Sequence, residues 1–173
     1  MAIDDGTNEE VAPAAESGAA EADDEDARAA GDPAFVLAME EGIAAAESRE
    51  YAAALAAIRR AVELRPEDAE AHYNLGVLYG MLCMEDLKVE EFFEDHSDEE
   101  IVMARAIHHY ELAVQFDPEF FHAYNNLATL HAIHGSYKLA VQALDESLRI
   151  NPDQPDVKEE LAELRPAEPS LSP

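Results

Sequence analysis

The feature that most constrains this chain is an internal repeat of about 34 residues, found three times with one interruption. One pair of marker positions is occupied by Ala38 and Gly42, then by His72 and Gly76, then by Tyr124 and Ala128. A second set consists of Ala54, Ala61 and Pro66, then Ala106, Ala113 and Pro118, then Ala140, Ser147 and Pro152. Spacing of this kind is typical of solenoids, in which each unit packs on its neighbours.

Two of these spacings are 52 residues instead of 34, which places an insertion of 18 residues between Tyr79 and Ala106. The run Ser97-Asp98-Glu99-Glu100 has the form of a capping box, and it predicts a helix that begins at about Asp98. Divided between the two helices of the unit, the extra residues lengthen each by about 13 Å. The sequence therefore predicts an elongated middle hairpin.

These units resemble the tetratricopeptide repeat, whose pattern is Trp-x-x-Leu-Gly-x-x-Tyr followed by Ala, an aromatic residue, Ala and Pro. The second and third units read His72-x-x-Leu75-Gly76-x-x-Tyr79 and Tyr124-x-x-Leu127-Ala128-x-x-His131. The first is weaker, because Ala38, Glu41 and Ala45 stand where large apolar residues are usual. The resemblance implies an all-α fold, a right-handed solenoid of antiparallel helix pairs.

Four kinds of segment follow along the chain. Residues 1–32 contain almost no large apolar side chain, which predicts a disordered acidic tail. The repeat domain is expected over residues 33–165, with Pro33 in the first turn of its first helix. Its parts are repeats at 35–68, 69–120 and 121–154 and a capping helix at 156–164, followed by a frayed tail at 166–173.

Charge limits the classes of partner. The chain has 39 Asp and Glu against 11 Lys and Arg, a formal net charge of −28, so nucleic acid is not expected to bind. The acid-rich, Lys-poor composition resembles that of proteins from salt-accumulating halophiles, and an ordinary acidic protein is the alternative. The sequence has no run of 18 apolar residues, so no membrane span is expected. Its acidic N-terminus and its single cysteine, Cys83, predict a cytoplasmic protein.

The resemblance also implies a concave groove, lined by the first helix of each repeat, that binds an extended or helical peptide. The matching positions are Met39, Ile43, Tyr73, Asn74, Val77, Met81, Asn125, Asn126, Thr129 and Ile133. Most of them are apolar, which suits an amphipathic helix, and the amides of Asn74 and Asn126 can hold a peptide backbone. Acidic residues surround these positions, so we expect a neutral or basic partner.

Some members of the family clamp an acidic C-terminal chaperone peptide with Lys and Arg from these helices. Here Met39 and Ile43 stand at the first clamp positions, where Lys and Asn would be. His122 and Asn126 replace the later cations, so a carboxylate would meet no fixed positive charge. The expected function is a non-catalytic scaffold for a different peptide or helix.

Two aromatic residues near the tip of the predicted hairpin, Phe92 and Phe93, allow a second hypothesis. Both rings can close the hairpin against itself, or Phe92 can form an exposed contact, because adjacent helical residues point about 100° apart. In the second case the protein would be a self-assembling structural protein that associates through its hairpin or its groove.

Motifs of catalysis and metal binding are missing from the sequence. It shows no nucleophile-base pair or phosphate-binding glycine loop, so we expect neither an enzyme nor a bound cofactor. His131 and His134 are one helical turn apart, but two imidazoles without a third ligand rarely hold zinc. The acidic hairpin tip lacks the central Gly of a calcium loop. We therefore predict no metal site.

Overall fold

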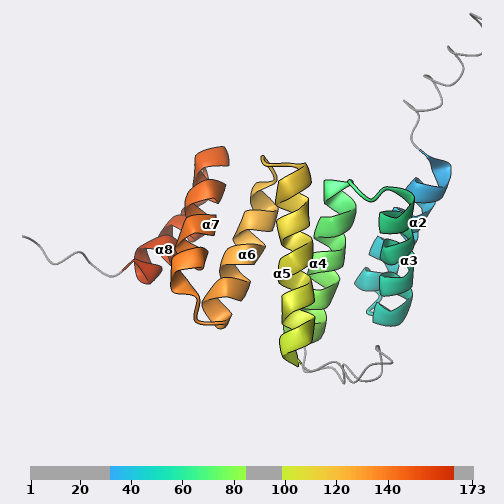
Figure 1. The fold of residues 1–173 in the computed structure, drawn as a ribbon, viewed down its shortest axis with the longest axis horizontal. Coiled ribbons are helices and arrows are strands. Elements are labelled where there is room, and N and C mark those ends of the chain that lie inside the picture. Colours follow the sequence, from blue (N-terminus) through green and yellow to red (C-terminus); the bar gives the residue numbers. More distant parts are fainter. Residues whose placement is uncertain (1–31, 85–98, 166–173) are drawn as a thin grey trace, which may run out of the picture. The chain divides into compact units, whose positions relative to one another are not determined.

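The structure is a computed structural model that describes residues 32–84 and 99–165. Within these ranges it contains seven α-helices and no strand, all in one compact unit that begins at Pro33 (Figure 1). The helices are α2 (Pro33–Glu47), α3 (Tyr51–Leu64), α4 (Ala69–Met84), α5 (Glu99–Phe116), α6 (Phe121–Ile133), α7 (Tyr137–Ile150) and α8 (Pro155–Leu164). The predicted all-α fold is confirmed.

The helices are arranged as a stack of antiparallel pairs. The closest packing is within the pairs α2–α3, α4–α5 and α6–α7, and α3–α4 and α5–α6 join successive pairs (Figure 1). The first helices of neighbouring pairs also touch, since α2 contacts α4. This arrangement is that of a solenoid, in which each unit buries its apolar faces against the next.

The core forms where the repeat markers lie. Six markers of the second helices are completely buried: Ala54, Ala61, Ala106, Ala113, Ala140 and Ser147. Small side chains at these sites let helix axes approach closely, while larger residues such as Ile58, Leu82 and Leu144 fill the space between them. The small residues therefore recur every 34 residues because each lies where two helices cross.

Two glycines in first helices allow especially close contact with the second helices. A Cβ atom on Gly42 would lie 2.4 Å from Ile58 Cδ1, and one on Gly76 would lie 2.8 Å from the Tyr110 ring. Both distances are shorter than carbon atoms tolerate without movement. The small residues expected at these positions are thus required by the packing of α2 on α3 and of α4 on α5.

We expect Gly76→Ala to lower the free energy of unfolding by about 1 kcal/mol. Overpacking against Tyr110 costs about 2 kcal/mol, and the better helix propensity of Ala returns about 1 kcal/mol. The matched control is Gly80→Ala in the same helix, whose Cβ would lie an ordinary 3.6 Å from Tyr110 Oη. It should raise the free energy of unfolding by about 0.5–1 kcal/mol. Urea denaturation followed by circular dichroism measures both changes. If the two variants changed the free energy of unfolding in the same direction, this interpretation would be contradicted.

The middle pair has the longest helices of the described chain. α4 has 16 residues and α5 has 18, whereas the helices of the other two pairs have 13 to 15. α5 begins at Glu99, close to the capping box. The rest of the insertion, with Phe92 and Phe93, lies outside the described residues, as do the predicted acidic and frayed tails except for Asp32.

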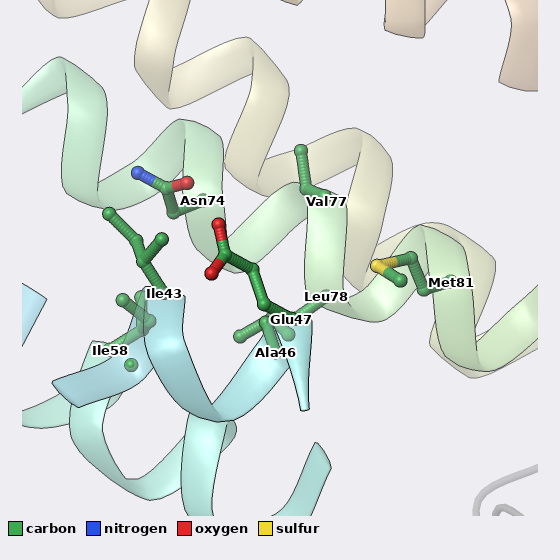
Figure 2. A pocket seen from close by; sticks show the side chains of 9 residues that line it. Ile43, Ala46, Glu47, Ile58, Asn74, Val77, Leu78 and Met81 are labelled. Carbon is green, nitrogen blue, oxygen red and sulfur yellow. The ribbon is translucent and has the colours of Figure 1, made fainter. Parts of the chain in front are cut away.

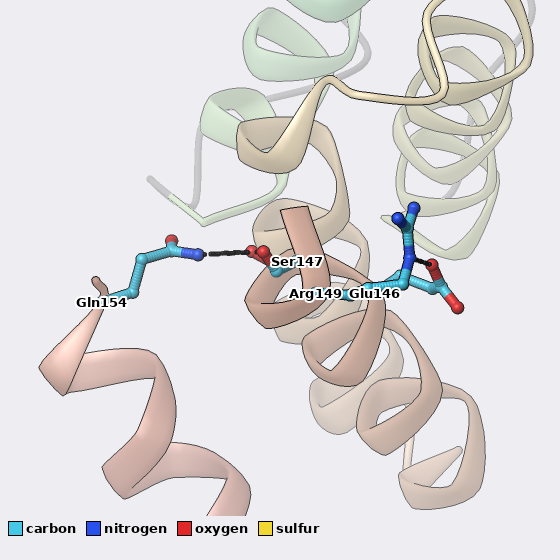
Figure 3. Close-up of polar contacts among 4 residues, drawn as sticks. All are labelled: Glu146, Ser147, Arg149 and Gln154. Carbon is cyan, nitrogen blue, oxygen red and sulfur yellow. Dashed lines mark hydrogen bonds and ion pairs between the residues drawn. The ribbon is translucent and has the colours of Figure 1, made fainter. Parts of the chain in front are cut away.

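The last helix covers the end of the third pair. α8 packs on α7 with Leu161 buried and with Val157 and Leu164 partly buried against the core. Gln154, just before α8, donates from Nε2 to the Ser147 hydroxyl over 2.9 Å (Figure 3). Ser147 occupies a position that holds Ala in the first two repeats, and this bond satisfies its buried hydroxyl.

Candidate functional site

A pocket of about 200 Å³ lies between α2 and α4 (Figure 2). Its lining comes from α2, α4 and one residue of α3: Gly42, Ile43, Ala46, Glu47, Ile58, Asn74, Val77, Leu78 and Met81. Most of these side chains are apolar, with Glu47 and Asn74 as the polar exceptions. A site of this kind can take up an apolar side chain and orient it through a few polar groups.

A second pocket, of about 330 Å³, lies on the other side of α4. It is lined by Tyr73, Val77, Gly80, Met81, Tyr110, Asn126, Thr129 and Leu130, from α4, α5 and α6. Val77 and Met81 line both pockets, so the two adjoin along α4. We call the two pockets together the groove.

Tyr73 and Tyr110 line the second pocket, and Tyr73 also packs on Phe120 outside it. The ring of Tyr73 lies 4.7 Å from the ring of Phe120 and 5.8 Å from that of Tyr110, measured between centroids. Burial, with a smaller contribution from Tyr73, raises the pKa of Tyr110 above the usual range of a phenol. Its hydroxyl therefore stays neutral at physiological pH and can donate a hydrogen bond.

The amides of the groove have hydrogen-bonding capacity left for a ligand. Asn74 donates from Nδ2 to the backbone oxygen of Glu70 over 2.9 Å, which fixes the side chain on its own helix. Asn126 donates from Nδ2 to the Tyr73 hydroxyl over a longer 3.4 Å. Asn126 also forms a side-chain hydrogen bond with Tyr110, which leaves its carbonyl oxygen for a peptide backbone, whereas Asn74 keeps one donor hydrogen and its carbonyl oxygen.

Seven of the ten groove residues expected from the sequence line these pockets: Ile43, Tyr73, Asn74, Val77, Met81, Asn126 and Thr129. Three lie elsewhere. Met39 is buried, at 7% exposure, and belongs to the core. Asn125 donates to Gln154 over 2.8 Å, so its amide joins α6 to the start of α8. Ile133 is 53% exposed at the end of α6 and lines neither pocket.

Sequence reasoning missed several residues of the groove, most importantly Glu47. Glu47 follows Ile43 by four residues, which places both on one face of α2. That spacing could have identified it. Tyr110 could not be identified in this way, because it comes from a second helix and reaches the groove beside Gly80, where no side chain intervenes.

A pair of histidines forms a separate polar cluster between α4 and α5. Nδ1 of His72 lies 3.1 Å from Nδ1 of His109, and Nε2 of His72 lies 2.9 Å from the carbonyl oxygen of Pro66. Since a carbonyl can only accept, Nε2 of His72 carries the hydrogen, and in that tautomer Nδ1 is an acceptor. His109 therefore donates from Nδ1, with its other face stacked on Tyr79 at 5.6 Å between centroids.

This environment disfavours a charged His109. Burial is the main cause, and the nearby positive charges of Arg59 and Arg105 and the neighbouring His72 and His108 add to it. Together they lower the pKa of His109 from 6.5 to about 4. His109 is accordingly neutral at physiological pH. The described residues include no group of three or more His, Cys, Asp or Glu placed to hold a metal ion.

Two family models match the chain. The one described as TPR repeat matches residues 46–82, and the one described as tetratricopeptide repeat matches residues 103–155. The first match spans α3 and nearly all of α4, and the second spans most of α5 and all of α6 and α7. Of the helices that line the groove, α3, α4, α5 and α6 thus lie wholly or mostly within the matched residues, and α2 lies mostly before them.

A curated relative and several solved structures are similar to the chain. It is 31% identical over 111 residues to mouse protein O-mannosyl-transferase TMTC1, an overlap of 64% of this chain and 10% of the relative. The chain therefore spans about a tenth of the length of the curated relative that it matches. No helix of the described residues has the length and apolar character needed to cross a membrane.

The structural neighbours are repeat domains of the same kind. The TPR domain of Arabidopsis OM64 superimposes with a TM-score of 0.62 at 20% identity, covering 76% of this chain and 94% of that one. The first TPR of Spaghetti (RPAP3), bound to the HSP90 peptide SRMEEVD, gives a TM-score of 0.60 at 15% identity, covering 75% and 91%. These structures show the same fold, and the two family matches, which together cover about half of the chain, show that it belongs to the tetratricopeptide-repeat family.

Proposed function

We propose that this protein is a non-catalytic interaction scaffold that binds a peptide or helix of a partner protein in the groove along α4. The observation that carries the proposal is the pair of adjoining pockets, which share Val77 and Met81 and combine an apolar lining with amide groups. Apolar anchors give a peptide its affinity, and the amides of Asn74 and Asn126 give it direction. An amphipathic helix or an extended segment with apolar residues fits this lining.

The RPAP3 neighbour supports the general mode, since its TPR domain was solved with a peptide bound. The peptide of that complex ends in Glu-Glu-Val-Asp, and the groove described here does not suit such an acidic end. The clamp positions carry Met39, Ile43, His122 and Asn126, and Met39 is buried in the core. We therefore propose a partner peptide of different chemistry.

The test is a selection of random 12-residue peptides displayed on phage, with the purified protein as the target. We expect enrichment on the wild type and a loss of affinity of about tenfold or more with Val77→Glu, because a carboxylate would then stand where both pockets meet. The matched control is Leu139→Glu, which adds the same charge at an apolar side chain that is 46% exposed outside the groove.

Failure to enrich peptides on the wild type, or equal losses for the two variants, would contradict the proposal. Light scattering over a concentration series tests the self-assembly hypothesis on the same proteins. An oligomer that is lost in Val77→Glu and kept in Leu139→Glu would assign the groove to a second copy of the chain. A monomer at all concentrations would leave the groove free for a foreign peptide.

A further inference from the structure

Charge is distributed unevenly between the first and second helices of the pairs. Within the bounds given above, α2, α4 and α6 contain no Lys or Arg. The same three helices contain four carboxylates, Glu40, Glu41, Glu47 and Glu70. The first helix of each pair therefore has no Lys or Arg. The electrostatic field around the groove favours a cationic ligand.

Glu47 brings this charge to the groove itself. Among the described residues that line the two pockets, it is the one with a charged side chain. The other three lie elsewhere. Glu41 Oε2 is 3.9 Å from Arg60 Nη1, and Glu40 and Glu70 line neither pocket. In Figure 2 the Glu47 carboxylate is drawn near Asn74, and both residues line the first pocket together with Ile43 and Val77.

The position of Glu47 is unfavourable for the helix that carries it. It is the last residue of α2, and the last turn of that helix has no basic residue. The C-terminal end of a helix is the negative end of its dipole, so a carboxylate there reduces helix stability and a cation would increase it. Helix stability thus gives no reason for an acid at this position, whereas a ligand-binding role does.

We propose that the first pocket recognises a peptide in which an apolar side chain is followed or preceded closely by Lys or Arg, with Glu47 pairing with the cation. This inference rests on the proposed function and names the chemistry of its ligand. A cavity of about 150 Å³ can hold a benzene molecule, so the pocket of about 200 Å³ accommodates a side chain the size of Leu, Met or Phe. Glu47 is exposed, so the cation would pair with its carboxylate at the solvent-facing rim of the pocket, with the modest strength of a surface ion pair.

The experiment uses the peptides enriched on the wild type, synthesised with a fluorophore, together with copies in which each Lys or Arg is changed to Gln. Fluorescence anisotropy at about 0.15 M KCl gives their Kd values on three proteins: wild type, Glu47→Gln and Glu63→Gln. Glu63 is exposed on α3 and lines neither pocket, so its substitution changes the net charge equally without touching the groove. This control measures how much of the change in Kd comes from the net charge of the protein alone.

We expect the enriched peptides to carry a cation beside an apolar residue. Glu47→Gln should raise their Kd about fivefold. Glu63→Gln should change their Kd by less than twofold, and the Gln copies should bind wild type and Glu47→Gln equally. Thermal unfolding separates binding from structure. If Glu47 had only a structural role, its substitution would lower the melting temperature. Glu47→Gln should leave the melting temperature unchanged or raise it while the affinity falls.

Two results would overturn the inference and leave the proposed function standing. One is enrichment of peptides without a cation that still lose affinity with Val77→Glu. The other is an equal weakening of basic peptides by Glu47→Gln and Glu63→Gln. If no peptide is enriched, or if Val77→Glu has no effect, the proposed function itself fails.

Discussion

Replacing Leu144 by Ala is expected to lower the free energy of unfolding by about 3–4 kcal/mol. Leu144 lies on α7 with 0% exposure and is among the largest fully buried side chains of the described chain. The substitution removes the transfer energy of several methylene groups and leaves a cavity that the helices of a close-packed pair cannot fill. Urea denaturation followed by circular dichroism measures the change.

The matched control for this prediction is Leu139→Ala on the same helix. Leu139 is 46% exposed, so its truncation removes little buried surface and should cost less than about 0.5 kcal/mol. The two variants have the same composition and the same change in helix propensity, so their difference isolates burial. Similar losses in both would show that α7 does not pack as described.

The second large effect concerns pH. His109 has a pKa of about 4 in the folded protein against 6.5 in an unfolded chain, so the unfolded state binds more protons between these values. The stability contributed by neutral His109 is therefore fully present above about pH 6.5 and is lost as the pH falls toward 4. The full shift corresponds to at most about 3 kcal/mol, and we expect about 2 kcal/mol because water reaches part of the ring.

Isolating this effect requires a variant, since the many carboxylates of the chain also titrate as the pH falls. His109→Gln keeps a donor for Nδ1 of His72 and removes the titrating imidazole. Wild type should lose about 2 kcal/mol more than His109→Gln between pH 6.5 and 4, by urea denaturation at each pH. Parallel curves for the two proteins would contradict the buried, neutral state of His109.

Much of the fold was predictable because its determinants repeat. The markers at Gly42 and Gly76 recur with a fixed spacing since each sits where two helices approach too closely for a Cβ atom. Leu144 follows the same logic, as a large apolar residue at a position that every repeat buries. A pattern of this kind can be recognised in a single sequence, because the same helix–helix contact recurs in each repeat and requires the same type of residue.

The groove was predictable in part, for the same reason. Val77 and Met81 lie at positions that the repeat pattern turns toward the groove, and both line its two pockets. Met39 and Asn125 match the pattern equally well, yet one is buried and the other is bonded to Gln154. The repeat pattern specifies the direction of a side chain, and the neighbouring helix decides whether that side chain meets core, solvent or a partner.

By itself, the sequence determined the all-α fold, the family and the strong acidity, because periodic spacing and composition act locally and additively. The tertiary structure alone decided which groups meet across helices that are distant in the chain. It brought His109 onto His72, 37 residues away in the chain, and Asn125 onto Gln154, 29 residues away. Each of these contacts occurs once, depends on the angle and distance between two helices, and leaves no periodic trace in the sequence.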